Sequence, residues 1–224
     1  MAAAWIALAL SLKVALAATL LAGVLGVACG YALARWRFRG RDVIDALLTL
    51  PLVLPPTVLG YYLLVLLGRQ GPLGSWLETQ FGVRLVFTWQ GAVVAAALVA
   101  FPLVFKAARA AFETVEPQLE AAARVLGVAD AAVFFRITLP LAWRGILAGL
   151  LLAFARALGE FGATLMVAGS IPGQTQTLSI AVYEAVLAGQ DDVARMLVII
   201  VSLACVAVLL GATALAPGHV AGHR

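Results

Sequence analysis

Charged residues are scarce in this 224-residue sequence: Asp, Glu, Lys and Arg together make up 12% of it. A soluble globular domain carries roughly 25%. Hydrophobic residues reach 64%, and the mean hydropathy is +1.06. This composition excludes an ordinary soluble domain. It predicts an all-α, polytopic membrane protein, with residues 1–224 forming one bundle and no separate soluble domain.

Cysteine and histidine are nearly absent as well. Cys29 and Cys205 lie within apolar runs, which favours small packing residues over a disulfide or a metal pair. His219 and His223 lie in a C-terminal tail without ligand partners nearby. The sequence has no GxxxxGK[ST] phosphate loop and no Ser–His–Asp or Cys–His set. We therefore expect no catalysis by this chain, no cofactor and no metal.

Five apolar stretches are long enough to cross a bilayer as helices. They are Val14–Ala34, Ala46–Gly68, Leu85–Phe105, Pro140–Val167 and Met196–Ala216. Turn residues over Arg69–Arg84 predict a short outer loop with a surface helix near Trp76–Phe81. A polar, broken stretch before the last span predicts another outer loop, with a short helix over Leu178–Leu187. If that helix crossed the membrane, it would make a sixth span.

The basic residues predict how these spans are oriented, because cytoplasmic loops carry an excess of Lys and Arg. Ten of them fall in segments on the expected cytoplasmic side: Arg35, Arg37, Arg39, Arg41, Lys106, Arg109, Arg124, Arg136, Arg144 and Arg224. Four fall on the outer side: Lys13, Arg69, Arg84 and Arg195. The N-terminus is therefore expected outside and the C-terminus in the cytoplasm. The net charge of +4 reports this orientation and does not indicate nucleic-acid binding.

The most polar internal stretch, Glu116–Pro140, follows the third span on the cytoplasmic side. Its helix signals are Pro117 for a first turn, Gly127 for a left-handed residue past a helix end, Asp130 as a cap, and Thr138 with Pro140 for the start of another helix. These signals predict a compact, charged hairpin over residues 116–138. A hairpin of this kind between membrane helices predicts a docking surface for a partner.

Two features inside the spans are candidates for a translocation path or gate. Pro51, Pro55 and Pro56 lie in the second span, where prolines free backbone carbonyls and kink a helix. That helix either bends to fit its neighbour or breaks and lines a route. Arg156 and Glu160 lie four residues apart in the fourth span, so they are expected on one helix face. Charges in a span face the bundle interior or a water-filled cavity. The pair either holds this helix in place or lies near a path.

The hairpin resembles the cytoplasmic loop of binding-protein-dependent ABC importer permeases. The matching residues are Glu120, Ala121, Ala122, Gly127, Ile137, Leu139 and Pro140. One position departs from the family: counting back from Gly127, its usual Glu position holds Ala121, and Glu120 lies one residue earlier. In that family the loop forms a coupling helix that sits in a groove of the ATPase subunit. The resemblance implies that the matching residues couple this chain to an ATPase.

Two further stretches, Leu50–Leu64 and Phe154–Tyr183, resemble the permeases of molybdate importers. Related sulfate and tungstate permeases share the sequence of Leu158–Gly162, whereas Ile171–Thr177 favours molybdate. With the hairpin, the resemblance runs from Leu10 to Val208. It implies a type I ABC importer fold and a permease that moves molybdate by alternating access, with sulfate or tungstate as the alternative substrate.

The same resemblance implies the partners. ATP would be used by a separate ATPase dimer, because this chain has no ATP site. The permease would pair with a second copy of itself in the lipid of a bacterial inner membrane, and an outer, periplasmic protein would deliver the anion. A stand-alone ion-coupled carrier fits less well, since it would show an inverted repeat and more intramembrane acids than Glu160. A membrane enzyme would need a catalytic set.

Overall fold

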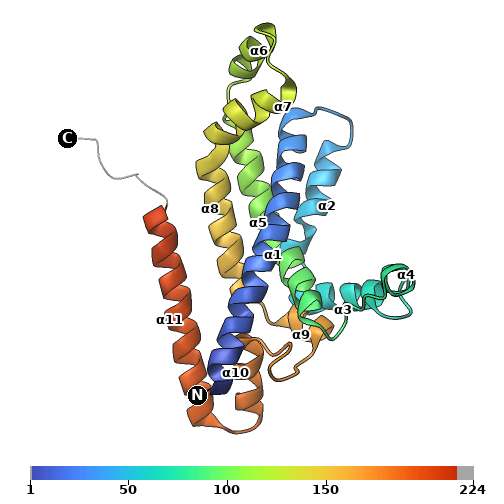
Figure 1. The fold of residues 1–224 in the computed structure, drawn as a ribbon, viewed down its shortest axis with the longest axis vertical. Helices are drawn as coiled ribbons and strands as arrows, with labels where there is room; N and C mark the ends of the chain where they lie inside the picture. Colours follow the sequence, from blue (N-terminus) through green and yellow to red (C-terminus); the bar gives the residue numbers. More distant parts are fainter. Residues whose placement is uncertain (1, 216–224) are drawn as a thin grey trace, which may run out of the picture.

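The computed structural model describes residues 2–215, which form helices joined by short turns. In chain order the helices are α1 Ala2–Arg35, α2 Arg41–Val53, α3 Pro56–Leu67, α4 Pro72–Phe81, α5 Trp89–Glu113, α6 Pro117–Val125, α7 Asp130–Val133, the π-helical turn η1 Phe134–Thr138, α8 Leu139–Leu158, α9 Gly162–Ala168, α10 Leu178–Leu187 and α11 Asp191–Leu215. Figure 1 shows α1, α2, α5, α8 and α11 along the length of a bundle. The hairpin α6–α7 caps one end, α10 lies at the other, and α3 and α4 project sideways.

Small side chains let α1, α5 and α8 pack closely as the core of the bundle. A Cβ added to Gly26 would lie 2.9 Å from Val104 Cβ, and one on Gly30 would lie 2.9 Å from Arg109 N. The buried alanines of this core are Ala15, Ala18, Ala22, Ala92, Ala96, Ala97, Ala100, Ala153 and Ala157. Lipid is as apolar as these side chains, so close backbone approach and dispersion hold the helices together.

Helix length and apolar composition give fewer spans than the five predicted. Among the described residues, α1, α5 and the continuous helix over Asp130–Leu158 are long and apolar enough to cross a membrane. The pair α2–α3, bent by 110°, makes up to four. Five spans therefore remain a prediction. The tail that carries His219, His223 and Arg224 lies outside the described residues.

The short helices at the turns agree with the sequence. The predicted helix over Leu178–Leu187 is α10, with the same bounds, and its 10 residues fall short of the roughly 20 that a span requires. The predicted surface helix near Trp76–Phe81 is the second half of α4.

The helices do not begin and end where the predicted spans do. The first helix begins at Ala2, so Lys13 lies within it, with its Nζ 3.6 Å from the centroid of the Trp89 ring. The third helix starts only at Trp89, because Thr88 caps it by accepting a hydrogen bond from Gly91 N. It continues to Glu113, where an ion pair with Arg109 supports the last turn. The fourth breaks after Leu158.

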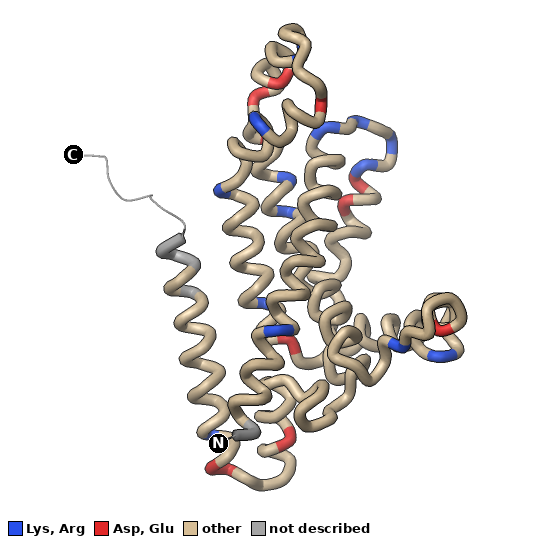
Figure 2. The backbone as a smooth tube through the Cα atoms, in the orientation of Figure 1, with Lys and Arg blue, Asp and Glu red and all other residues tan. Residues whose placement is uncertain are grey.

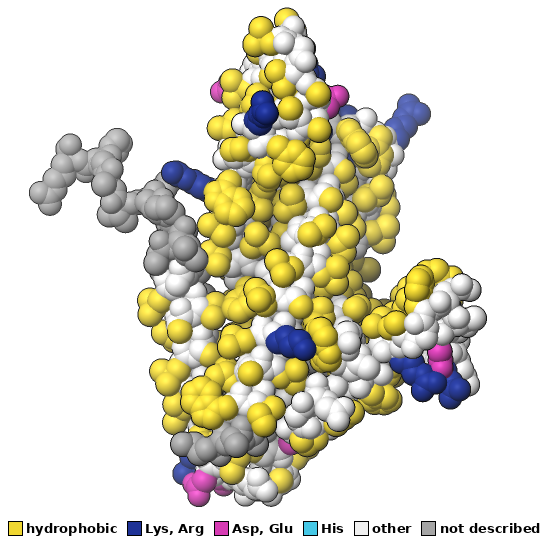
Figure 3. Space-filling view, viewed as in Figure 1, with side chains coloured by type: hydrophobic (Ala, Val, Ile, Leu, Met, Phe, Trp, Pro, Cys, Tyr) yellow, Lys and Arg dark blue, Asp and Glu magenta, His cyan; other side chains and the backbone are white. Residues whose placement is uncertain are grey.

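Charge is distributed unevenly along the bundle. Figure 2 shows Lys, Arg, Asp and Glu gathered around the hairpin and the turn between α1 and α2. Figure 3 shows mostly hydrophobic side chains over the middle of the face in view, across α1, α8 and α11. This distribution fits a bundle that lies in lipid with its charged end in water.

Candidate functional site

The second predicted span is a broken helix and not a regular bend. Leu54 and Pro55 have extended backbone, with ψ angles of 140° and 136°, between the end of α2 and the start of α3. Each of them precedes a proline, and the residue before a proline is disfavoured in helical conformation. Pro56 then opens α3, where its missing N–H is no loss. Pro51 lies inside α2 without breaking it.

The fourth predicted span contains a second break. α8 ends at Leu158 and α9 begins at Gly162. Glu160 lies between them, only 3% exposed, and its Oε1 accepts a hydrogen bond from Ala163 N at 2.9 Å. Its Oε2 lies 2.7 Å from Nη1 of Arg156. The predicted ion pair therefore forms, but Glu160 lies beyond the end of α8 and not on its face. Oε1 thus binds the start of α9, whereas Oε2 pairs with the cation at the end of α8 by charge and has no hydrogen-bond partner among the described residues.

The two breaks meet where α3 packs on α9. A Cβ on Gly162 would lie 3.1 Å from Pro56 Cβ, and one on Gly60 would lie 2.7 Å from Met166 Cβ. Leu59, Leu63 and Leu67 of α3 share a buried cluster with Ala163 and Val167 of α9. The candidate path residues Pro55, Pro56 and Glu160, which lie on different spans, thus belong to one region of the fold.

Of the two predicted short helices, the first forms as α6, whereas the second, α7, is the first turn of the continuous helix over Asp130–Leu158. Pro117 opens α6, and Gly127 is left-handed, with a φ of +80°. Asp130 does not cap α7: the residue before the helix is Ala129, and Asp130 Oδ1 instead accepts a hydrogen bond from Arg124 Nε at 2.7 Å. This bond closes the hairpin and raises the pKa of the Arg124 guanidinium, which stays charged.

Thr138 does not start a helix either. The chain is helical without interruption over Asp130–Leu158, and Thr138 is the last residue of the π-helical turn inside it. Its hydroxyl is fully buried and donates to Glu120 Oε1 at 2.8 Å. The hydroxyl therefore binds another helix and is not free to cap its own.

The predicted coupling residues differ in exposure. Glu120 is 3% exposed and faces the bundle. Ala121, Ala122, Gly127 and Pro140 are exposed, and Ile137 and Leu139 are half-buried. The end of α6 adds two apolar residues that the sequence did not single out, Val125 at 87% exposure and Leu126 at 82%. These adjacent side chains form a small exposed apolar patch at the tip of the hairpin.

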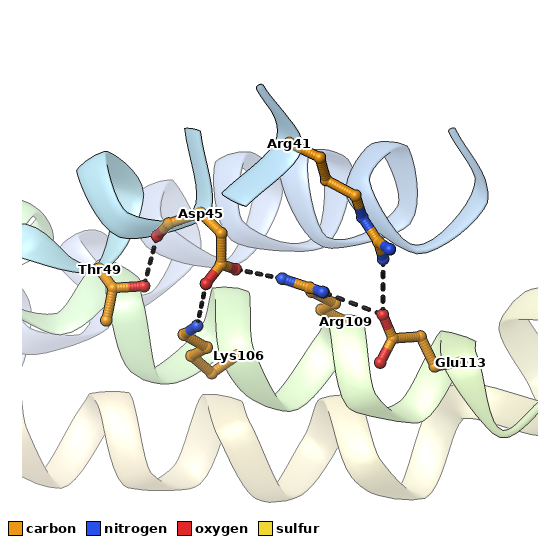
Figure 4. A network of polar contacts seen from close by, with 6 residues as sticks. All are labelled: Arg41, Asp45, Thr49, Lys106, Arg109 and Glu113. Atoms are coloured by element: carbon orange, nitrogen blue, oxygen red, sulfur yellow. Dashed lines mark hydrogen bonds and ion pairs between the residues drawn. The ribbon is translucent and has the colours of Figure 1, made fainter. Parts of the chain in front are cut away.

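An ionic network between α2 and α5 was also missed by the sequence analysis (Figure 4). Asp45 Oδ2 lies 2.5 Å from Lys106 Nζ, and Asp45 Oδ1 pairs with Arg109. Arg109 and Arg41 both bind Glu113 Oε1, at 2.9 and 2.8 Å. α2 has no fully buried residue and packs the partly buried Leu48 on the core, so these ion pairs add to a small apolar contact in holding α2 to α5. An acid inside an otherwise apolar stretch, at Asp45, was the available signal.

The family described as "Binding-protein-dependent transport system inner membrane component" matches residues 22–219. The chain belongs to this family. The family description names a transport-system component of the inner membrane, and the apolar helices agree with a multi-pass membrane protein.

Relatives in this family cover nearly the whole chain. The "Molybdenum transport system permease protein ModB" of Escherichia coli K12 is 46% identical over 208 residues, 92% of this chain and 91% of the relative. The protein of the same name from Haemophilus influenzae is 44% identical over 206 residues, 91% and 90%. The "Putative molybdenum transport system permease protein YvgM" of Bacillus subtilis is 44% identical over 185 residues, 83% and 82%.

Solved structures with low sequence identity share the fold. A chain of the MetNI methionine ABC transporter, in an inward-facing conformation, has a TM-score of 0.72 at 14% identity and covers 92% of this chain and 91% of its own. A chain of a bacterial alginate ABC transporter, in complex with its alginate-bound periplasmic protein, has a TM-score of 0.71 at 18% identity, covering 92% and 76%. The fold is therefore that of an ABC importer permease.

Proposed function

We propose that this chain is the transmembrane permease of an ATP-driven importer for molybdate. The observation that carries the substrate is the 46% identity, over 92% of the chain, to a molybdenum permease. The observation that supports the energy source is the hairpin, whose exposed Val125 and Leu126 offer a contact at one end of the bundle. A chain without an ATP site requires a separate ATPase to drive transport. A rigid helical hairpin is suited to the contact with that ATPase.

Each partner has a surface in this proposal. An ATPase dimer binds the hairpin tip and supplies all the ATP hydrolysis. A second copy of the chain covers the exposed apolar face of α2, which includes Val43, Leu47, Leu50 and Val53. Oligomers of this kind are closed and symmetric, which places the path along the two-fold axis. A periplasmic anion-binding protein approaches the opposite end, near α10. The N-terminus then lies outside and the C-terminus in the cytoplasm.

The region where the two breaks meet is the proposed gate. Pro55 and Pro56 leave backbone carbonyls without helical partners, and Glu160 holds Arg156 and α9 in place. The breaks allow α3 and α9 to rock against the long helices without bending them, as alternating access requires. No high-affinity cationic pocket is needed here, because the binding protein supplies affinity and selectivity.

Competition separates molybdate from its rivals. The permease, its ATPase and its anion-binding protein are reconstituted in liposomes, and uptake of labelled molybdate is measured with equal concentrations of sulfate or tungstate. We expect sulfate to leave molybdate uptake unchanged. Abolition of molybdate uptake by sulfate would instead assign the chain to sulfate import. Abolition by tungstate alone would indicate that molybdate and tungstate are both substrates.

A further inference from the structure

Glu120 makes an unusual contact for a residue of an exposed hairpin. Only Glu120 and Ala123 of α6 are buried. A carboxylate loses hydration on burial and is stable there only when it is paired and hydrogen-bonded. Glu120 Oε1 receives both partners: Arg35 Nη2 at 2.5 Å and the Thr138 hydroxyl at 2.8 Å. Its Oε2 lies 3.7 Å from Arg124 Nη2.

The partner Arg35 is the last residue of α1, a helix of 34 residues that runs along the bundle. The Arg35 side chain is 16% exposed. One turn earlier, Tyr31 packs its ring on Phe134 and Phe112, with centroid distances of 4.8 and 5.3 Å. The hairpin therefore contacts α1 over a full turn, through one ion pair and one aromatic contact.

The π-helical turn completes this arrangement. It spans Phe134–Thr138, and its hydrogen bond runs from Leu139 N to Phe134 O, five residues back instead of four, so it changes which side chains face the bundle. Phe134 faces Tyr31, Thr138 faces Glu120, and Phe135 between them is 65% exposed. Turns of this kind are frequent at functional sites.

We infer that Arg35 and Glu120 form a joint through which the hairpin moves α1 directly, besides α8, to which it is joined by the chain. Glu120 is then a positioning residue that faces the bundle, and the ATPase contacts the hairpin elsewhere, at Val125 and Leu126. This inference rests on the proposed function, because an ATPase must move the hairpin. Since α1 packs closely along α5, motion of α1 carries the core with it.

The test compares ATP hydrolysis with molybdate uptake in liposomes that hold the complete complex. Arg35→Gln removes the cation of the joint. Hydrolysis should continue, while molybdate imported per ATP falls about tenfold, as expected for loss of one coupling contact. Arg35→Lys should restore most of the coupling. Arg41→Gln is the matched control: it also breaks an arginine–carboxylate pair at the same end, with Glu113 at 2.8 Å, but touches no part of the joint.

Several results would overturn the joint. Unchanged uptake per ATP in Arg35→Gln would do so, as would an equal loss in Arg41→Gln. Loss of ATPase binding by Arg35→Gln would place Arg35 in the docking surface. If Arg35→Gln cannot be purified, Thr138→Val decides, with uptake per ATP expected to fall about threefold and an unchanged ratio contradicting the joint. A wild-type complex without ATP-dependent uptake would refute the proposed function itself, whereas coupled wild type with coupled Arg35→Gln refutes the joint alone.

Discussion

Pro56 and Gly162 lie in contact across the two helix breaks: Pro56 Cβ is 3.1 Å from the position that a Cβ on Gly162 would occupy. Two spans that are far apart in the chain thus meet at the points where each loses its helical hydrogen bonds. Gly60 and Met166 make a second close contact of the same pair of helices. Substitutions that add a Cβ at this contact should therefore change the stability of the protein.

Gly60→Ala should destabilise the protein although Ala is the better helix former by about 1 kcal/mol. The new Cβ would lie 2.7 Å from Met166 Cβ and 3.0 Å from the Ala163 backbone. Overpacking of this kind costs about 1–3 kcal/mol. Thermal unfolding in detergent measures the loss. Gly159→Ala is the control, because its Cβ would meet only Ala155 O at 3.8 Å. Equal melting temperatures for the two variants would contradict the close packing of α3 on α9.

Glu160→Gln should lower stability more than it changes anion choice. The amide oxygen can still accept from Ala163 N, but Arg156 loses its counter-charge, at a cost of about 1–3 kcal/mol. The double variant Arg156→Gln/Glu160→Gln should recover part of the loss, because it leaves no unpaired charge. Melting temperature and the ratio of molybdate to sulfate uptake are measured together. An altered anion preference at unchanged folding yield would overturn the structural role of the pair.

Gly127→Ala should uncouple transport, and Gly189→Ala should not. Both glycines are left-handed, with φ of +80° and +66°, and neither would place a Cβ within 4 Å of another atom. Each substitution therefore costs about 1–2 kcal/mol of backbone strain, but only Gly127 shapes the hairpin.

Gly127→Pro and Glu120→Arg should uncouple transport more strongly than Gly127→Ala. Gly127→Pro does so because it also removes the N–H that donates to Arg124 O. Normal uptake by these two variants with the ATPase bound would show that the hairpin does not couple.

Asp45→Asn should loosen α2 from α5, since it weakens the pairs with Lys106 and Arg109 and α2 has no fully buried side chain. The expected loss is about 1 kcal/mol, because the pairs are partly exposed. Hydrogen–deuterium exchange over residues 41–53 should become faster than in wild type. Asp42→Asn, with no ion pair of its own among the described residues, should leave exchange unchanged. Equal exchange in both variants would show that the ion pairs of Asp45 do not hold α2 to α5.

Features set by local rules could be predicted from the sequence. The break at Leu54–Pro55 follows from two consecutive prolines, and the helix start at Pro117 and the left-handed Gly127 follow from steric preference. The membrane class follows from composition. The bounds of α10 follow from an apolar run between polar turns.

Contacts between distant segments could not be predicted. Arg35 and Glu120 are 85 residues apart, and Asp45 and Lys106 are 61 apart. Each of these residues is recognisable as polar, but pairing depends on how whole helices pack. The same limit explains Thr138, which looked like a cap and instead binds Glu120 across the hairpin.

Uptake of labelled molybdate into liposomes, with the chain alone or with its ATPase and ATP, tests the central claim most directly. We predict that molybdate accumulates only when the permease, the ATPase, ATP and the anion-binding protein are all present. Accumulation by the chain alone, driven by an ion gradient, would contradict the account and identify a stand-alone carrier.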